Sequence, residues 1–129
     1  MYRKASISAL LYYCIRIYSF RMENISDKAL ELIARRFRVL SEAVRLKLIN
    51  LLRDGEMSVT ELTAQLQTSQ PNVSKHLKIL TESGILRREQ RGNTVFYAIA
   101  DPSIFELCDS VCGSLGETLK KQANLFVVA

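Results

Sequence analysis

The sequence predicts a mainly α-helical domain with one small β-hairpin. Its 129 residues correspond to one domain, and they include five Gly, two Pro and no Trp, a composition that favours helices over turn-rich β structure. Because 48% of the residues are hydrophobic, the chain can form a core without a disulfide or a metal. This composition excludes collagen-like and disordered chains, and the length excludes a two-domain enzyme.

Four helices are predicted before the hairpin, because apolar residues recur there at helical spacing. Their expected ranges are 27–39, 43–52, 59–66 and 70–82. Ser41 is expected to cap the second helix, and Gly55 is expected to end it. Ser58 and Glu61 have the S-x-x-E spacing of a capping box at the start of the third helix.

The fourth helix carries the residues that suggest a function. Ser69 is its expected cap and Gly84 its expected stop. Its buried stripe consists of Val73, Leu77 and Leu80. The outward side is expected to hold Pro71, Asn72, Ser74, Lys75 and Lys78, with Gln70 and His76 on the flanks. An outward face of small polar and cationic side chains suits a nucleic-acid groove.

The hairpin follows this helix and is basic. Two strands are predicted at 85–90 and 94–99, around a Gly-containing turn, and the hairpin presents Arg88 and Arg91. The net charge of +5 is unevenly distributed, because the first 21 residues hold four bases and no acid. Residues 69–97 are locally cationic, whereas residues 101–117 carry four acids and no base.

A last helix is predicted after Asp101 and Pro102, which are expected to cap it. Its apolar residues recur at near-heptad spacing and are Ile104, Leu107, Val111, Leu115 and Leu119. This stripe predicts an interface between two copies of the chain, to which the first helix is also expected to contribute.

The predicted order of four helices, two strands and one helix is that of a winged helix-turn-helix domain. In such a domain the fourth helix enters the major groove and the hairpin places cations beside phosphates. Gln70 and Asn72 could pair with an adenine edge, and Ser69, Ser74 and Lys75 could bind phosphates or bases. Two alternatives stay open: the charges only solvate the surface, or the basic wing binds an acidic protein.

A longer pattern joins this helix to its flanks. It consists of Glu42–Ile49, the S-Q-x-x-V-S-x-H-L-x-x-L helix of Ser69–Leu80, the glycine stop at Gly84, and the wing residues 91–93 and 96–99. This pattern resembles the ArsR/SmtB family of bacterial repressors over about residues 27–120. The resemblance implies a dimer that binds operator DNA and represses nearby genes until a metal, metalloid or thiol-modifying signal releases it.

The resemblance also implies a set of DNA-binding residues. Carried over by position, the recognition residues are Ser69, Gln70, Asn72, Ser74, Lys75 and His76, and the wing contacts are Arg88 and Arg91. His76 has a second interpretation, because a lone His is more often structural. No cluster of metal-binding residues near it in the sequence points to a metal ligand.

The two best-known sensing sites of the family are not matched. The C-x-C pair is missing from residues 57–64, and the zinc register holds Asp101, Ser103, Ser114 and Glu117, with Ser in place of both imidazoles. The candidates that remain are Cys108 and Cys112, which lie four residues apart on one helix face. They could bind As(III) or another soft metal ion, with Cys14 or a partner's thiol as the third sulfur. Oxidation or persulfidation, and inert packing, are the alternatives.

The first 21 residues join a basic start to an apolar run that Arg16 interrupts. This run is too short and lacks the cleavage site for a signal peptide or membrane span, so no membrane partner is expected. We predict an extension at residues 1–21 and the domain at 22–129. No nucleophile elbow, phosphate loop or carboxylate pair supports an enzyme. Three widely spaced Cys indicate a reducing cytoplasm.

Overall fold

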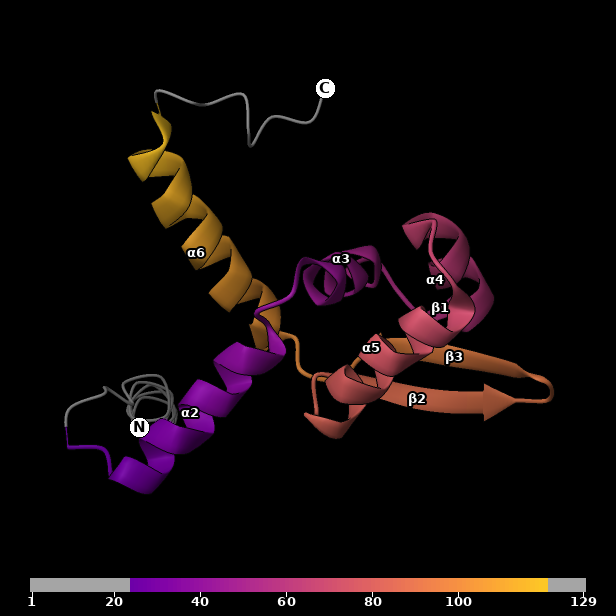
Figure 1. Ribbon diagram of the computed structural model, residues 1–129, viewed down its shortest axis with the longest axis horizontal. Coiled ribbons are helices and arrows are strands. Elements are labelled where there is room, and N and C mark those ends of the chain that lie inside the picture. The colour runs from indigo at the N-terminus through magenta and orange to yellow at the C-terminus, as the bar shows by residue number, and fades with distance from the viewer. Residues whose placement is uncertain (1–23, 121–129) are drawn as a thin grey trace, which may run out of the picture. The chain divides into compact units, whose positions relative to one another are not determined.

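The computed structural model describes residues 24–120 (Figure 1). The chain divides into two compact units, residues 1–34 and 35–129. Within the first unit the structure describes residues 24–34, which include the N-terminal part of the first described helix. The predicted extension at residues 1–21 and Cys14 lie outside the described residues.

The order of elements confirms the predicted winged helix-turn-helix fold. The elements are α2 (Asp27–Val39), α3 (Ala43–Leu51), β1 (Met57–Ser58), α4 (Val59–Leu66), α5 (Gln70–Glu82), β2 (Leu86–Arg91), β3 (Thr94–Ile99) and α6 (Ser103–Thr118). Three of the predicted helices have the expected bounds. They are α2, α4 and α5.

Local signals explain most of these bounds. The Ser58 hydroxyl accepts a hydrogen bond from the Glu61 N–H at 3.2 Å, and the Glu61 carboxylate accepts one from the Ser58 N–H at 2.8 Å, so the predicted capping box is present. Asp101 Oδ1 accepts from the Ser103 N–H at 3.1 Å at the start of α6. Gly92 has a φ of +60° in the two-residue turn of the hairpin, where a residue with a Cβ would be strained.

Helix α3 begins at Ala43 as expected, but the prediction that Ser41 caps it was wrong. Glu42 occupies the N-cap position and makes no side-chain cap, whereas the Ser41 hydroxyl donates to the Arg38 carbonyl at 2.7 Å. Ser41 therefore satisfies the end of α2 rather than the start of α3. The helix also ends at Leu51, before Gly55.

The sheet has one strand more than the predicted hairpin. All three strands are antiparallel in the order β1-β3-β2, with Met57 opposite Tyr97 and Ser58 opposite Phe96. The two residues of β1 pair with β3, and the second of them, Ser58, is also the N-cap of α4. This pairing attaches α4 to the base of the wing.

The core lies where α3, α4 and α5 meet the sheet. Its fully buried side chains are Leu48, Leu52, Leu62, Val73, Leu77, Leu80 and Ile85. Each such side chain contributes about 1.5 to 3 kcal/mol through the hydrophobic effect. The predicted stripe of α5 is thus confirmed as the face that holds the helix on the domain.

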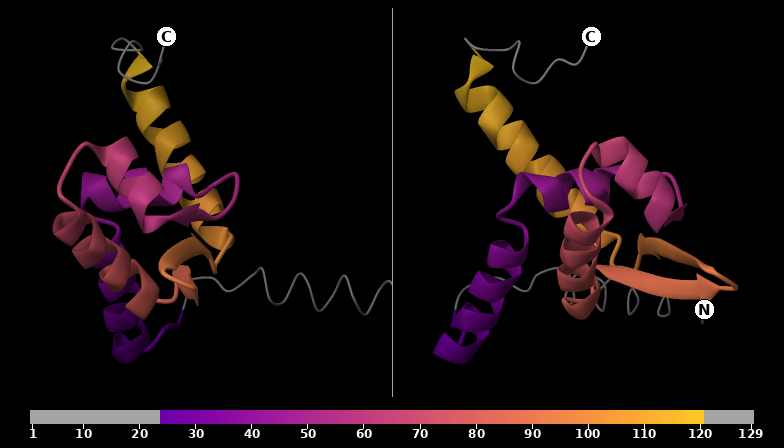
Figure 2. Two further views of the ribbon diagram at one scale, coloured as in Figure 1. Left: turned by 90° about the vertical axis from the view of Figure 1, so that its right-hand side faces the viewer. Right: turned by 45° about the vertical axis from the view of Figure 1, so that its right-hand side comes forward.

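Helix α6 packs on the core only through its first turns (Figure 2). Ile104 is 3% exposed, whereas Val111 and Leu115 are 49% and 46% exposed. The predicted stripe therefore begins with the core residue Ile104, continues with Leu107, which is half-buried and packs against the core, and becomes exposed at Val111 and Leu115. None of the helices within residues 24–120 has both the length and the apolar character that a membrane span requires.

Candidate nucleic-acid interface and apolar groove

The N-terminus of α5 is exposed and organised by its cap. The Ser69 hydroxyl accepts a hydrogen bond from the Asn72 N–H at 3.4 Å, and Pro71 occupies the first turn. Pro71 has no N–H, and Val73 donates to the Ser69 carbonyl at 3.1 Å. The Gln70 N–H is therefore the group of this turn that, with the helix dipole, favours an anion. This end of α5 is therefore suited to bind a phosphate.

The predicted recognition residues differ in exposure. Ser69, Gln70 and Lys75 are exposed, whereas Asn72 and Ser74 are half-buried. The Asn72 amide Nδ2 donates to the Thr68 hydroxyl at 3.3 Å, which orients the side chain in the free protein. Ser69 is the N-cap of α5, and the other four of these residues lie in the N-terminal half of the helix.

His76 does not fit the predicted direct contact with DNA. Its side chain is buried, and its Nδ1 lies 3.2 Å from Nη1 of Arg45, which is also buried. The carboxylate of Glu42 lies 3.9 Å from Nε2 on the other side of the ring. The prediction placed His76 on a flank of the helix, and the packing of α3 against α5 covers that flank. His76 therefore joins two helices inside the protein.

The two predicted cations of the wing have different surroundings. Arg88 is exposed, and no acid pairs with it among residues 24–120. Arg91 instead donates to the Glu56 carboxylate, lies 3.5 Å from Glu89, and stacks 4.1 Å over the ring of Phe96. Of the two predicted wing cations, Arg88 is thus the one without an acidic partner, whereas Arg91 holds the wing to Glu56, the residue before β1.

The hydrogen bond between Arg91 and Glu56 shifts the pKa of both groups. The bond from Arg91 lowers the pKa of the Glu56 carboxyl below its ordinary value, and the same bond raises the pKa of Arg91. Sequence reasoning missed Glu56 because it lies 35 positions from Arg91. No local pattern indicates that contact.

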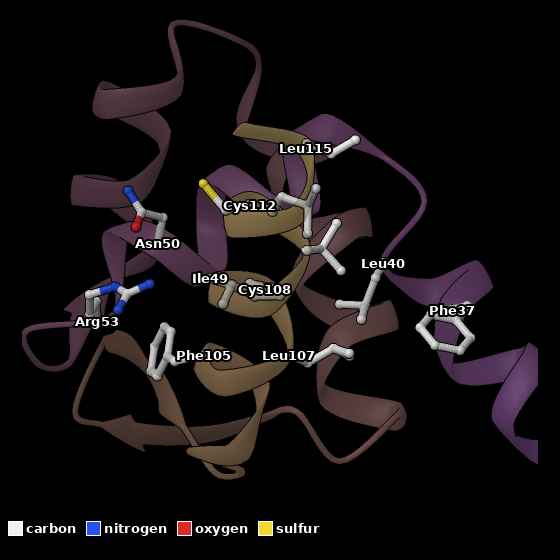
Figure 3. Close-up of a pocket in the computed structure, with 12 residues that line it drawn as sticks. Phe37, Leu40, Ile49, Asn50, Arg53, Phe105, Leu107, Cys108, Cys112 and Leu115 are labelled. Carbon is white, nitrogen blue, oxygen red and sulfur yellow. The ribbon is translucent and has the colours of Figure 1, made fainter. Parts of the chain in front are cut away.

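A second feature is an apolar groove between α3 and α6, with a volume of about 390 Å³ (Figure 3). It is lined by Phe37, Leu40, Leu46, Ile49, Asn50, Arg53, Phe105, Leu107, Cys108, Val111, Cys112 and Leu115. The exposed residues of the α6 stripe, Val111 and Leu115, form part of its wall. Arg53 closes one end by pairing with Asp109 at 3.1 Å and stacking 4.4 Å over the ring of Phe105.

Both candidate thiols line this groove (Figure 3). Cys108 is half-buried and Cys112 is exposed. Burial raises the pKa of the Cys108 thiol, and the nearby Asp109 adds to that effect, while Arg53 opposes it. At neutral pH the Cys108 side chain is therefore a protonated thiol, which is a weak nucleophile.

The residues in the zinc register do not form a metal site. Asp101 Oδ1 accepts hydrogen bonds from both the N–H and the hydroxyl of Ser103, so it serves as a helix cap. Among residues 24–120 no group of three His, Cys, Asp or Glu side chains could hold a metal ion. These residues do not fit zinc.

Comparison with known proteins agrees with this geometry. Residues 43–88, from the start of α3 into β2, match the family model described as "Bacterial regulatory protein, arsR family". The chain is 36% identical over 94 residues to the HTH-type transcriptional repressor SmtB of Mycobacterium tuberculosis, which covers 73% of this chain and 67% of that repressor. The chain belongs to the ArsR family.

Two further matches describe the extent of the likeness. This ArsR-family chain is 34% identical over 85 residues to the regulator KmtR of Mycobacterium tuberculosis, covering 66% of the chain and 65% of KmtR. It thus spans about two thirds of the length of these relatives. The homodimeric winged helix-turn-helix domain Mb0332 of Mycobacterium bovis superimposes with a TM-score of 0.65 at 25% identity, over 78% of this chain and 95% of that domain. The family consists of transcriptional regulators and not of enzymes.

Proposed function

We propose that this ArsR-family protein is a homodimeric repressor that binds operator DNA through the N-terminal half of α5, the recognition helix. The observation that carries the proposal is the exposed, Ser69-capped start of α5, a helix that packs against strand β2 of the basic hairpin. A helix of this kind fits the major groove, with its first residues at the base edges. Gln70 and Asn72 are the proposed base-reading residues.

Phosphate contacts complete the proposed interface. Ser69, Ser74 and Lys75 flank the base-reading residues on the same helix, and Arg88 extends the positive surface onto the wing. Contacts of this kind position the protein but carry little sequence information. We therefore assign specificity to α5 and general affinity to the cations.

Fluorescence anisotropy tests this function directly. The reduced protein is titrated into a labelled duplex from the region upstream of its own gene, and into a scrambled duplex of equal length. We expect tighter binding to the first duplex and a steep loss of affinity for both as salt rises. Equal affinity for both duplexes, or none, would contradict the proposal and favour the basic wing as a protein-binding surface.

Replacing Asn72 by Ala is expected to lower operator discrimination by about 1 to 3 kcal/mol, because a bidentate base contact is lost. Arg88→Ala is the matched control, since losing a phosphate contact weakens both duplexes alike and reduces the salt slope by about one unit. Both are measured by the same anisotropy titrations. Equal losses on operator and scrambled DNA for Asn72→Ala would reject its base-reading role.

The exposed apolar groove is the structural argument for the proposed dimer. Val111 and Leu115 are about half exposed in the protomer, and water around such a contiguous apolar surface is unfavourable. An isologous contact, in which α6 of one copy covers the groove of the other, would bury both surfaces at once. The structural relative from Mycobacterium bovis is homodimeric, which supports a dimer of this chain but does not identify its interface.

For the signal, we propose As(III), bound by the Cys108 and Cys112 thiols in this groove. The two residues lie one helical turn apart, with Cβ atoms about 5 to 6 Å apart, and soft thiol ligands suit a metalloid. Arsenous acid reacts with protonated thiols, since each As–S bond forms as one hydroxyl of As(OH)₃ and the thiol proton leave as water. The raised pKa of Cys108 therefore disfavours peroxide or persulfide chemistry more than it disfavours As(III). This chemistry requires reduced thiols, so the proposed compartment is the cytoplasm.

Adding As(III) is expected to lower operator affinity at least about tenfold, a loss in the usual range of allosteric coupling. The double variant Cys108→Ser/Cys112→Ser should bind the operator normally and ignore As(III). Anisotropy with and without As(III), Zn(II), peroxide and persulfide separates the candidate signals. Release by As(III) from the double variant would contradict the thiol site, and indifference of the wild type would assign both cysteines to packing.

A further inference from the structure

The guanidinium of Arg45, a residue of α3, is buried between the end of α2 and helix α5. The residue is 6% exposed. Its Nε donates to the Val39 carbonyl and its Nη2 donates to the Arg38 carbonyl at 3.3 Å. These carbonyls lie at the C-terminal, negative end of the α2 dipole. The Arg38 carbonyl also accepts from the N–H and the hydroxyl of Ser41, so the guanidinium shares this carbonyl with Ser41 and binds the Val39 carbonyl as well.

The remaining arm of the same guanidinium contacts the recognition helix. Nη1 lies 3.2 Å from Nδ1 of His76 and 3.5 Å from the Glu42 carboxylate. Arginine has only donors, so Nδ1 of His76 accepts and the proton of the neutral ring is on Nε2, the nitrogen that faces Glu42. One planar group therefore joins the end of α2 to α5.

The end of α2 also takes part in the apolar groove. Phe37 and Leu40 line the groove, and the carbonyls of Arg38 and Val39 between them bind Arg45. A second copy of the chain that covers the groove would therefore contact residues 37–40, whose carbonyls bind Arg45. The guanidinium is rigid, so a shift of this segment must be followed by the imidazole or must break a buried hydrogen bond.

We propose that Arg45 is a positioning residue that couples residues 37–40 of the groove to the recognition helix through His76. This inference rests on the proposed function. Apolar contacts of Val73, Leu77 and Leu80 hold α5 on the core, but such contacts are non-directional. The hydrogen bond to His76 is directional and sets the rotation of α5 about its axis, and hence the direction in which Gln70 and Asn72 point.

The test compares operator and scrambled duplexes for full-length variants. Arg45→Met removes the guanidinium and keeps an apolar stem. Its operator-to-scrambled affinity ratio is expected to fall about tenfold or more, while its affinity for scrambled DNA stays close to wild type. Lys47→Met is the matched control, because it removes an exposed positive charge from the same helix. It should leave the ratio unchanged.

Variants of His76 separate positioning from simple structural support. Asn places an amide oxygen close to the position of Nδ1, so His76→Asn should retain most of the ratio. His76→Leu fills a similar volume without an acceptor and should lose the ratio as Arg45→Met does. The double variant Arg45→Met/His76→Leu should lose no more than either single variant, since both remove one interaction.

The outcomes of this test separate a failure of the proposed function from a failure of the inference about Arg45. A wild type that does not discriminate between the duplexes would overturn the proposed function and this inference with it. If the wild type discriminates between the duplexes and Arg45→Met has the same operator-to-scrambled affinity ratio, only the inference would be overturned. If Arg45→Met does not fold, the His76 pair decides: equal ratios for His76→Asn and His76→Leu would overturn the coupling, even where their melting temperatures differ.

Discussion

Replacing Val111 by Asp is expected to separate the dimer into folded protomers. Val111 is 49% exposed in the protomer, so the substitution leaves the core of the domain intact. In a symmetric dimer it would bury two carboxylates in the apolar groove. An uncompensated buried charge costs about 3 to 5 kcal/mol, which raises the dissociation constant of the dimer by about 10² to 10⁴.

Sedimentation velocity over a range of protein concentrations measures this effect. Ser110→Asp is the control, because Ser110 is an exposed neighbour on α6 that does not line the groove. It should sediment as the wild type does. We also expect Val111→Asp to bind the operator weakly, since a monomer contacts one half-site only. A Val111→Asp protein that sediments as an unchanged dimer would reject the groove as the interface.

Replacing Leu77 by Ala is expected to have the largest effect on stability. Leu77 is fully buried on the inner face of α5, and truncating a buried Leu removes its transfer energy and leaves a cavity. The expected cost is about 2 to 5 kcal/mol, against a total stability of about 5 to 15 kcal/mol. The same change should loosen the recognition helix on its support and weaken operator binding.

Urea unfolding at a fixed protomer concentration measures this loss, because dimerisation makes apparent stability depend on concentration. Lys78→Ala is the matched control on the next residue, which is exposed and pairs with Glu82 at 3.9 Å. An exposed pair four residues apart contributes about 0.5 kcal/mol or less. Equal midpoints for Leu77→Ala and Lys78→Ala would show that the core does not depend on Leu77.

The extent and order of the helices follow from the sequence itself. The capping box of Ser58 and Glu61, the Ser69 cap with Pro71, and Gly92 in the wing turn all act over four residues or fewer. Hydrophobic spacing also identified the inward face of α5, which holds Val73, Leu77 and Leu80. Fold class and the exposed start of α5 were therefore predictable, because every signal involved is local.

Contacts between distant segments required the tertiary structure. β1 is two residues long and exists as a strand only because β3 lies beside it, and Ser41 bonds backward to Arg38 rather than forward. His76 lies on a flank of α5 that helical spacing alone leaves undecided, and the packing of α3 buries it against Arg45.

In the wing, too, the local features were predictable from the sequence and the long-range contact was not. Its strands, its turn and its two arginines were predicted from residues within one hairpin, whereas the pairing of Arg91 with Glu56 was not. A charged residue pairs with the nearest opposite charge in space, and only the folded chain determines which charge that is. The sequence by itself therefore determined which segment is proposed to face the DNA, the capped start of α5. The tertiary structure decided that Arg91 pairs with Glu56, that Arg88 has no acidic partner among residues 24–120, and that His76 is buried.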